Sequence, residues 1–573
     1  MKKIIVVLLF CFSNSVFSQA FLNLDFEYNI QGAQKPQKWF TGGNGYIAVL
    51  DDLEKASLSR SLKIVSNNPK GNEFGVCTGY FPVDLVKGKN IEFTGKIKTN
   101  DVTGGYAGLW WRVDGKNGVL GFDNMSDRGL KGTNDWKQVS IKMKVNEEIT
   151  NINFGALFVG QGTAWFDDFG IMIEGEKFID LKPRTEEPTP DELAWLKQNI
   201  YPLKTYEPGS TSNEDLKILI KLIGNSKVVA LGETTHGSSE IFKMKHRIIK
   251  YLSENAGFDI FSIEANMPES YKLNDYVLEG RGNPTELIKG MYFWTWRTQE
   301  VLNMVEWMMN HNKSGDKIYF TGFDMQFYFG AIQELSEAFK DQFEIQNVIT
   351  ELKTALDAVN NERKNSRQAV VSQEYKNKIG NQLNSLCSFI SRSNYPLSKK
   401  SWLSQNIRII EQYMDNTSRD KYMAENLLWI KSQNPDSKII AWAHNGHIKE
   451  TGYSMGRYLS DSLKNDYLTI GFTFHKGNYT AVGDNGLTNY QAQESYPGTY
   501  EYFFNAINEP IFIMDLREIK KQNSIYSKWL LDQLLFRSVG AMKMDNEFYE
   551  TDLTADFDLI IFISESTNSK LLE

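Results

Sequence analysis

The sequence predicts a multidomain protein in which an N-terminal all-β jelly-roll sandwich is followed by an α/β domain with a mainly parallel sheet and a helical insertion. Three observations predict this fold class. Short apolar runs separated by Gly, Asn and Asp fill residues 19–175, which is typical of a β-sandwich. From residue 191 onward, apolar runs alternate with helical patterns, which indicates βαβ units. Between about residues 330 and 430 the strand signal vanishes and long helical patterns replace it.

Residues 1–18 have the pattern of a cleaved signal peptide. Lys2 and Lys3 precede the apolar run 4–12, and a small residue, Ser18, stands at the expected cleavage position. We therefore expect the mature protein to be exported, either to the periplasm or out of the cell. No other stretch approaches the ~20 apolar residues of a membrane span, so we expect no transmembrane segment.

The composition argues against several classes of protein. The formal net charge is −8 and no long basic run occurs, so we expect no nucleic-acid partner. Cys11, Cys77 and Cys387 fall in different predicted segments, and they therefore do not form a disulfide framework. A hydrophobic content of 41% is ample for packed cores in more than one domain.

The N-terminal sandwich is expected from seven short strands. They lie at 47–50, 61–65, 90–97, 107–113, 138–145, 152–159 and 163–171. Aromatic residues among them could stack on sugars, although we expect most to belong to the core: Tyr80, Trp110, Trp111, Trp136 and Trp165. The motifs NLDFE (23–27) and TAWFDD (163–168) resemble the ends of galactose-binding-like jelly rolls in carbohydrate-binding modules. That resemblance implies a glycan partner and a structural calcium ion held by Glu27 and Asp168.

A proline-rich linker, residues 176–190, precedes the α/β domain, which we place at 191–573. Its strands are expected at 228–231, 260–264, 318–322, 439–443, 468–472, 511–514 and 559–563. The helical insertion, including patterns at 345–370 and 399–429, is expected to pack over one edge of the sheet. Such a cap would shape a pocket and exclude water from it.

The stretch VVALGETTHGSS, residues 228–239, organises the rest of the chain. A buried strand stops at Gly232, a loop carries Glu233 and His236, and a helical pattern follows. Ligands of open α/β sheets bind beyond the carboxyl ends of the strands, where this loop would lie. The loop therefore offers a carboxylate and an imidazole, three residues apart, to a ligand.

Three other predicted strands also end in reactive groups. They contribute Glu264, Asp324, and the pair His444 and His447. A histidine with an ordinary pKa of ~6.5 is a suitable base at neutral pH, and a carboxylate can orient it. A second histidine or a cation would then stabilise a developing oxyanion. This set predicts hydrolysis by an activated water, with no cofactor.

Four alternatives remain open from the residues. The same acids and histidines include zinc-ligand types, so metal-assisted hydrolysis is one. The sequence GYSMG (452–456) matches the nucleophile-elbow pattern around Ser454, although a helix N-cap explains this serine equally well. Glu233 and Glu264 could also be the acid pair of a glycosidase. The fourth alternative is a polysaccharide-binding envelope protein with a non-catalytic α/β domain.

Seven stretches together resemble the erythromycin esterase family. They are LGETTHG (231–237), KHR (245–247), IEA (263–265), YFWTWRTQE (292–300), GFDM (322–325), RDKYMAEN (419–426) and HNGH (444–447), within roughly residues 195–565. The resemblance implies ester hydrolysis of macrolide lactones, an antibiotic-resistance activity, by an activated water without a covalent serine. It implies that His236 is the general base, that Glu233 and Glu264 are its acidic partners, and that His444 and His447 are the second histidine pair.

The chain departs from the family at Lys245, where the macrolide-opening members carry an arginine. Lysine keeps the charge but loses the two-pronged hydrogen bonding of a guanidinium, and Arg247 is the candidate to compensate for this loss. The predicted signal peptide and sandwich are a second departure, and both put the macrolide substrate in question. We expect a small-molecule ester or lactone substrate. The candidate substrate-binding residues are Lys245, Arg247, Trp294, Arg297, Asp324 and Arg419.

Overall fold

The computed structural model describes residues 19–573 apart from 30–33, 68–72, 117, 183, 185–186, 315, 366–370, 416 and 532–533. The predicted signal peptide, residues 1–18, lies outside the described residues. The chain divides into two compact units, the first ending at residue 183 and the second beginning at Arg184. None of the helices described is long and apolar enough to cross a membrane.

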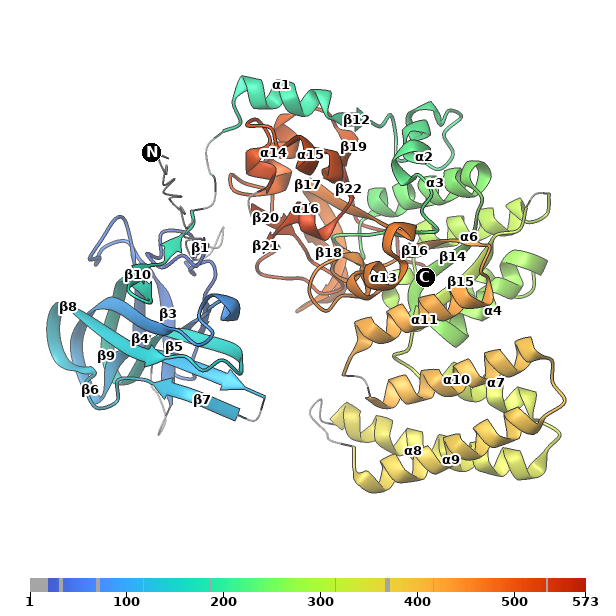
Figure 1. Cartoon of the computed structure of the whole chain (residues 1–573), viewed down its shortest axis with the longest axis horizontal. Coiled ribbons are helices and arrows are strands. Elements are labelled where there is room, and N and C mark those ends of the chain that lie inside the picture. Colours follow the sequence, from blue (N-terminus) through green and yellow to red (C-terminus); the bar gives the residue numbers. More distant parts are fainter. Residues whose placement is uncertain are drawn as a thin grey trace, which may run out of the picture. The chain divides into compact units, whose positions relative to one another are not determined.

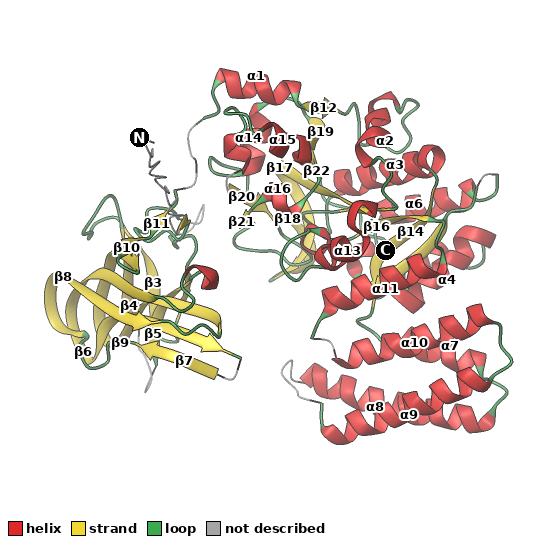
Figure 2. Ribbon diagram, in the orientation of Figure 1, coloured by secondary structure: helices red, strands yellow, loops and turns green. Residues whose placement is uncertain are grey.

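The first unit consists of β-strands, as predicted (Figure 2). Its strands are β1 (Gln19–Ala20), β2 (Phe40–Gly42), β3 (Tyr46–Asp51), β4 (Ser61–Ser66), β5 (Phe74–Tyr80), β6 (Asn90–Gly115), β7 (Gly118–Asp123), β8 (Leu130–Lys144), β9 (Ile149–Ile173), β10 (Glu176–Lys177) and β11 (Ile179–Asp180), with the short 3-10 helix η1 (Val83–Leu85). Most of them form one sheet in the order β2-β5-β9-β4-β3, and β6 pairs with β7, β8 and β9. All of these pairings are antiparallel.

Two of these strands are much longer than the sequence predicts. The expected strands 90–97 and 107–113 are both part of β6, and 152–159 and 163–171 are both part of β9. Their ladder is interrupted by register shifts instead of by turns. Glycines make this possible, since Gly160 has a φ of 94° and a Cβ there would lie 2.3 Å from the carbonyl oxygen of Thr103. Glycines that look like turn signals are therefore kinks within continuous strands.

The second unit alternates strands and helices. Its strands are β12 (Ile200–Pro202), β13 (Val228–Leu231), β14 (Phe258–Asn266), β15 (Tyr319–Asp324), β16 (Lys438–Trp442), β17 (Tyr467–Gly483), β18 (Gly486–Gln491), β19 (Ile511–Asp515), β20 (Leu534–Arg537), β21 (Phe548–Thr551) and β22 (Leu559–Ser566). Its α-helices are α1 (Pro190–Gln198), α2 (Lys217–Ile223), α3 (Ser239–Ala256), α4 (Met267–Glu279), α5 (Pro284–Lys289), α6 (Gln299–His311), α7 (Phe329–Ala338), α8 (Phe343–Asn365), α9 (Gln373–Arg392), α10 (Leu397–Asp415), α11 (Arg419–Gln433), α12 (Asn445–Ile448), α13 (Met455–Leu463), α14 (Tyr500–Ala506), α15 (Leu516–Gln522) and α16 (Leu553–Asp556). All seven strands expected from the apolar runs are present.

The main sheet of this unit has the order β12-β19-β22-β17-β13-β16-β14-β15. The pairings from β22 through β15 are parallel, whereas β12 and β19 add antiparallel strands at the other edge. The central strand β13 lies between β16 and β17 and is buried along its whole length. Its carboxyl end is therefore flanked by the ends of neighbouring parallel strands.

Helices cover both faces of this sheet. Successive side chains of a strand point to opposite faces, so alternate residues of β13 pack into two separate cores. Val228 and Ala230 belong to a core with residues of α10, α11, α13 and α14. Val229 and Leu231 belong to a second core, with residues of α2, α3 and α6. This two-sided burial explains why β13 reads as an unbroken apolar run and not as an alternating one.

The helical insertion begins after β15 and ends before β16, close to the predicted bounds. Figure 1 shows α8 and α9 furthest from the sheet, with α11 between α10 and the sheet. The expected helical span 399–429 is two helices, α10 and α11. Helix α10 ends at Asp415, and α11 starts anew at Arg419 after the non-helical residues Thr417 and Ser418.

Candidate active site

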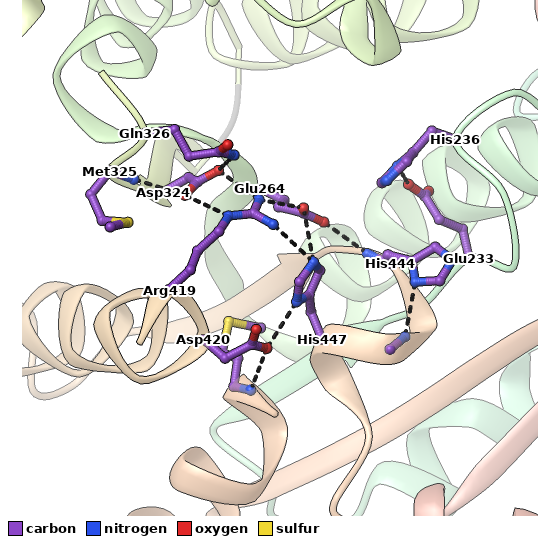
Figure 3. A network of polar contacts seen from close by, with 12 residues as sticks. Glu233, His236, Glu264, Asp324, Met325, Gln326, Arg419, Asp420, His444 and His447 are labelled. Atoms are coloured by element: carbon purple, nitrogen blue, oxygen red, sulfur yellow. Dashed lines mark hydrogen bonds and ion pairs between the residues drawn. The ribbon is translucent and has the colours of Figure 1, made fainter. Parts of the chain in front are cut away.

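Side chains from four neighbouring strand ends meet in one polar cluster (Figure 3). The registers place Leu231 of β13 and Ile263 of β14 on either side of Trp442 of β16. The loops that leave these strands therefore start at the same level of the sheet. They carry the predicted acids and histidines, and β15 adds a further carboxylate.

Glu233 and His236 form a buried pair in the loop after β13. The ring nitrogen Nδ1 of His236 lies 2.6 Å from Glu233 Oε1. An ionised carboxylate only accepts hydrogen bonds, so Nδ1 carries a proton and Nε2 is left as the basic nitrogen. No described residue lies within hydrogen-bonding distance of that Nε2, and the His236 side chain is 9% exposed. The hydrogen bond at Nδ1 therefore orients the imidazole, while Nε2 has no protein partner among the described residues.

Lys245 of α3 neutralises the charge of the Glu233 carboxylate. Its Nζ donates to Glu233 Oε2 at 2.7 Å and lies 4.4 Å from the ring centre of Trp442, whose indole also donates to Oε2 at 2.6 Å. Burial raises the pKa of Glu233, but the charge of Lys245 and the hydrogen bond from His236 outweigh it and hold that pKa below its ordinary value. Burial also lowers the pKa of Lys245 to about 8, against the attraction of Glu233. At pH 7 the pair is thus a carboxylate and an ammonium group.

A second ionic group surrounds Arg419, the first residue of α11. Its Nη2 lies 2.7 Å from both Glu264 Oε1 and Asp324 Oδ2, and its Nε donates to Asp324 Oδ1 at 3.2 Å. Burial raises the pKa of Glu264, but the charges of His447 and Arg419 hold it well below its ordinary value. Arg419 therefore ties the ends of β14 and β15 to the helical insertion.

His447 lies between two carboxylates. Its Nδ1 is 2.8 Å from Asp420 Oδ1, and its Nε2 is 3.3 Å from Glu264 Oε1. Burial lowers the pKa of His447, but Glu264 and Asp420 more than offset this and raise the pKa to about 10. The Nη1 of Arg419, 3.1 Å from Nε2, opposes that rise without cancelling it. His447 is consequently an imidazolium at neutral pH.

His444 has the opposite charge state. Its Nδ1 accepts from the backbone amide of Gly446 at 3.0 Å and caps α12, so the proton is on Nε2, which faces the carbonyl oxygen of Thr234 at 3.3 Å. Burial, together with His236 and His447, lowers the pKa of His444 to about 3. Both nitrogens are engaged with the backbone, and the ring lies 5.4 Å from that of His236. His444 therefore packs against His236 as a neutral ring with both of its nitrogens bonded to the backbone.

The His236 loop is held in place by distant backbone. The amide of His236 donates to the carbonyl of Gly540 at 3.2 Å, and the amide of Ser569 donates to the carbonyl of Gly237 at 2.8 Å. Trp296, in the 3-10 helix η3 (Trp294–Trp296), packs edge-on against the imidazole with ring centres 5.8 Å apart. These contacts fix the ring in one position.

The sequence profile described as erythromycin esterase matches residues 253–566. The chain belongs to the erythromycin esterase family. The matched range holds Glu264, Asp324, Arg419 and both histidines of the HNGH motif, while Glu233 and His236 precede it.

Two relatives and one solved structure show the extent of the likeness. Erythromycin esterase type II of Escherichia coli is 25% identical over 434 residues, 66% of this chain and 98% of its own length. The YbfO protein of Bacillus subtilis is 25% identical over 431 residues, 66% of this chain and 92% of its own length. A solved structure of a Bacillus cereus protein is 26% identical with a TM-score of 0.59, covering 68% of this chain and 100% of that one. The similarity thus extends over nearly the full length of each relative but over only about two thirds of this chain.

Most of the predicted site residues lie together in the polar cluster. Those in the cluster are Glu233, His236, Lys245, Glu264, Asp324, Arg419, His444 and His447. The prediction for Arg247 was wrong. Its buried guanidinium binds Asp215 and backbone carbonyls, because a residue two positions after Lys245 lies ~200° around the helix.

For Arg297 and Trp294, two other predicted substrate-binding residues, no bond to the cluster is found among the described residues, and their role stays a prediction. Arg297 donates to the carbonyl of Tyr292 at 3.0 Å, so its guanidinium holds the segment that leads into η3. Trp296, and not Trp294, is the tryptophan of η3 that contacts His236. The indole of Trp296 also donates to the carbonyl oxygen of Glu264 at 3.0 Å, which explains why this tryptophan faces the site.

The sequence analysis missed Asp420 and Trp442 as members of this site. Asp420 immediately follows Arg419 in the RDKYMAEN motif, and Trp442 stands two residues before His444. Both bind a predicted catalytic side chain directly. Adjacency to motif residues was therefore the signal available in the sequence.

Ser454 has a structural role. Its side chain caps α13 by accepting from the amide of Arg457 at 3.2 Å, and its hydroxyl donates to the carbonyl of Lys449 at 2.6 Å. No strand runs directly into this turn within the described chain, since α12 lies between β16 and Ser454. The GYSMG sequence thus begins a helix and does not form a nucleophile elbow.

The described residues contain no group of three or more His, Cys, Asp and Glu side chains arranged to hold a metal ion. In the first unit, Glu27 accepts from the amides of Ser59 and Arg60 at 2.9 and 3.1 Å. Asp168 pairs with Lys96 at 2.8 Å. The structural calcium ion at Glu27 and Asp168 stays a prediction.

Proposed function

We propose that this protein hydrolyses a carboxylic ester or lactone with a water molecule activated by His236. The observation that carries the proposal is the 2.6 Å contact between Glu233 Oε1 and His236 Nδ1, which leaves Nε2 free to accept a proton. Membership of a hydrolase family supports the reaction class. Membership of this family does not favour the alternative of a polysaccharide-binding envelope protein with a non-catalytic α/β domain.

The proposed reaction has two steps. Nε2 of His236 takes a proton from water as the water oxygen bonds to the ester carbonyl carbon, and the carbonyl electron pair moves onto its oxygen. The tetrahedral species then collapses, the bond to the alcohol oxygen breaks, and His236 returns the proton to that oxygen. Glu233 keeps the proton on Nδ1 throughout and stabilises the transient imidazolium.

A glycosidase is less consistent with this site. A glycosidase needs one carboxylic acid with a raised pKa to protonate the leaving group. Glu233 and Glu264 both have lowered pKa values, because cations neighbour each of them. Both carboxylates also already accept protein hydrogen bonds on each oxygen.

A panel of macrolides, simple lactones and 4-nitrophenyl esters, assayed with and without a chelator, tests the proposal. We expect turnover of at least one ester that is insensitive to the chelator. His236→Ala should lower kcat/KM by about 10²- to 10⁴-fold, the range of general-base catalysis. His311→Ala, at the end of α6, is the matched control and should keep full activity. Full activity in His236→Ala would exclude the proposed mechanism.

We propose further that the protein is exported, on the basis of the pattern of residues 1–18, and that the first unit binds a neutral glycan. A cavity of about 460 Å³ lies on its sheet. Its lining includes Tyr106, Trp110, Arg112, Phe122, Asn124 and Asn153. The indole nitrogen of Trp110 has no acceptor among the described residues, and Phe122 is 55% exposed. Aromatic faces with polar neighbours suit the faces and hydroxyls of sugars.

Affinity electrophoresis of the full chain in gels that contain neutral polysaccharides tests the glycan proposal. Trp110→Ala and Phe122→Ala should each reduce the retardation. Tyr80→Ala is the control, since Tyr80 is 63% exposed and does not line the cavity. Equal retardation of all three variants would place the glycan elsewhere or exclude it.

A further inference from the structure

Two positively charged groups lie side by side at the centre of the cluster. Nη1 of Arg419 is 3.1 Å from Nε2 of His447. Asp324 and Glu264 occupy Nε and Nη2 of Arg419, so no carboxylate is bonded to Nη1. His447 in turn directs Nδ1 to Asp420 and has only a long 3.3 Å contact between Nε2 and Glu264. Nη1 of Arg419 and Nε2 of His447 thus lie next to each other, and they are the nitrogens of the two side chains with the weakest contacts to carboxylates.

We propose that His447 and Arg419 together form the oxyanion-binding pole of the site, and that Asp420 is the positioning residue that keeps His447 charged. The inference rests on the proposed ester hydrolysis. Like charges this close repel one another in the free enzyme. A negatively charged oxygen that lies within hydrogen-bonding distance of both groups would be attracted by both and would offset their repulsion. Such a site favours the transition state over the uncharged ester, which is the requirement for catalysis.

The charge of His447 depends on groups from each element around it. They are Glu264 from β14, Arg419 and Asp420 from α11, and His444 at the start of α12. Of the two carboxylates, Glu264 contributes most to the raised pKa of His447 through its charge, whereas Asp420 makes the shorter contact and the stronger hydrogen bond to the ring. Asp420 Oδ1 also accepts from the amide of Met455 at 2.8 Å, so its position is fixed from a second side. Removing its charge should therefore change the protonation of His447 more than its position.

Asp420→Asn tests the assignment, since asparagine keeps the shape and one acceptor oxygen. Glu425→Gln is the matched control on the same helix, where Glu425 pairs with the partly exposed Arg408. With 4-nitrophenyl acetate as substrate, kcat of Asp420→Asn should fall on the order of 10²-fold at pH 8, with KM little changed. The loss relative to wild type should be smaller at pH 6, where His447 is protonated even without Asp420. Glu425→Gln should match wild type at both pH values.

The charge of His447 can also be measured without any substrate. Histidine labelled with ¹³C at Cε1 reports each imidazole by NMR, and His447→Gln identifies the His447 signal. In wild type this signal should keep the imidazolium shift from pH 6 to pH 8.5, whereas in Asp420→Asn it should titrate within that range. Circular dichroism at 222 nm checks that the variant is folded.

The outcomes separate the inference from the proposed function. An ordinary titration of His447 near pH 6.5 in wild type would overturn the assignment. So would a loss of kcat in Asp420→Asn that is equal at both pH values while His447 stays charged, because Asp420 would then act only on structure. If wild type does not cleave the ester but His447 stays charged, the ester proposal fails while the charged pair stands.

Discussion

Lys245→Met removes the cation from a fully buried ion pair. Lys245 and Glu233 both have side chains with no exposed surface, and their charged atoms are 2.7 Å apart. Breaking a buried pair by removing one partner costs about 3–5 kcal/mol, because the remaining charge is left without compensation. Trp442 and His236 still donate to Glu233 in the variant, so we expect a loss of stability near the lower end of that range.

The loss should depend on pH. In wild type the folded-state pKa of Glu233 lies below its ordinary value, so its ionisation stabilises the fold above about pH 4, and this contribution disappears as the pH falls. In the variant, burial without the lysine should raise that pKa, and protonation then relieves the buried charge. The difference in unfolding free energy between wild type and Lys245→Met should therefore be larger at pH 7 than at pH 4.5.

Urea unfolding followed at 222 nm measures this difference, since the helices lie almost entirely in the α/β unit. Lys243→Met is the control on the same helix, because Lys243 forms an exposed pair with Glu207 that contributes at most ~1 kcal/mol. If Lys245→Met cost less than Lys243→Met at pH 7, or cost the same at both pH values, the assignment of a buried ion pair behind the base would be incorrect.

Three further variants test other parts of the structure. Ser454→Ala should keep kcat/KM and lose about 1 kcal/mol of stability as a helix cap; loss of all turnover in a folded variant would revive the serine nucleophile. Gly540→Ala should lower the unfolding free energy by about 1–2 kcal/mol, because φ is 72° there, while a kcat within a few-fold of wild type is expected from a Cβ 4.0 Å from His444 Nε2. Arg247→Met should lower stability by about 3–5 kcal/mol in urea titrations without raising KM; a raised KM at unchanged stability would return Arg247 to the site.

The apolar patterns of the sequence predicted seven of the eleven strands described in the α/β unit, and they missed the short or peripheral strands β12, β18, β20 and β21. A strand buried on both faces, such as β13, must read as a continuous apolar run, and its end is marked by the first polar residue. The acids and histidines at these ends were therefore predictable as a group. The long strands β6 and β9 were not, since a glycine in a kinked strand and a glycine in a turn look the same in sequence.

Side-chain direction within helices and loops was harder to predict. Lys245 and Arg247 lie in one motif, yet helical geometry sends them to opposite faces of α3. Asp420 lay beside a predicted residue, but its partnership with His447 joins elements 27 residues apart. Such contacts depend on the tertiary arrangement of the helices and strands, which cannot be predicted from the spacing of apolar residues.

The ion pair between Asp324 and Arg419 joins residues 95 positions apart, with α7 to α10 lying between them in the chain. The entropy of closing such an excursion grows only slowly with its length, by roughly 0.6 kcal/mol for each doubling. This ion pair therefore does not limit the length of the insertion, whose stability comes instead from the apolar core that α10 and α11 share with β13. An insertion that is changed in length at α8 and α9 should keep the bond between Asp324 and Arg419 as long as that shared core is retained.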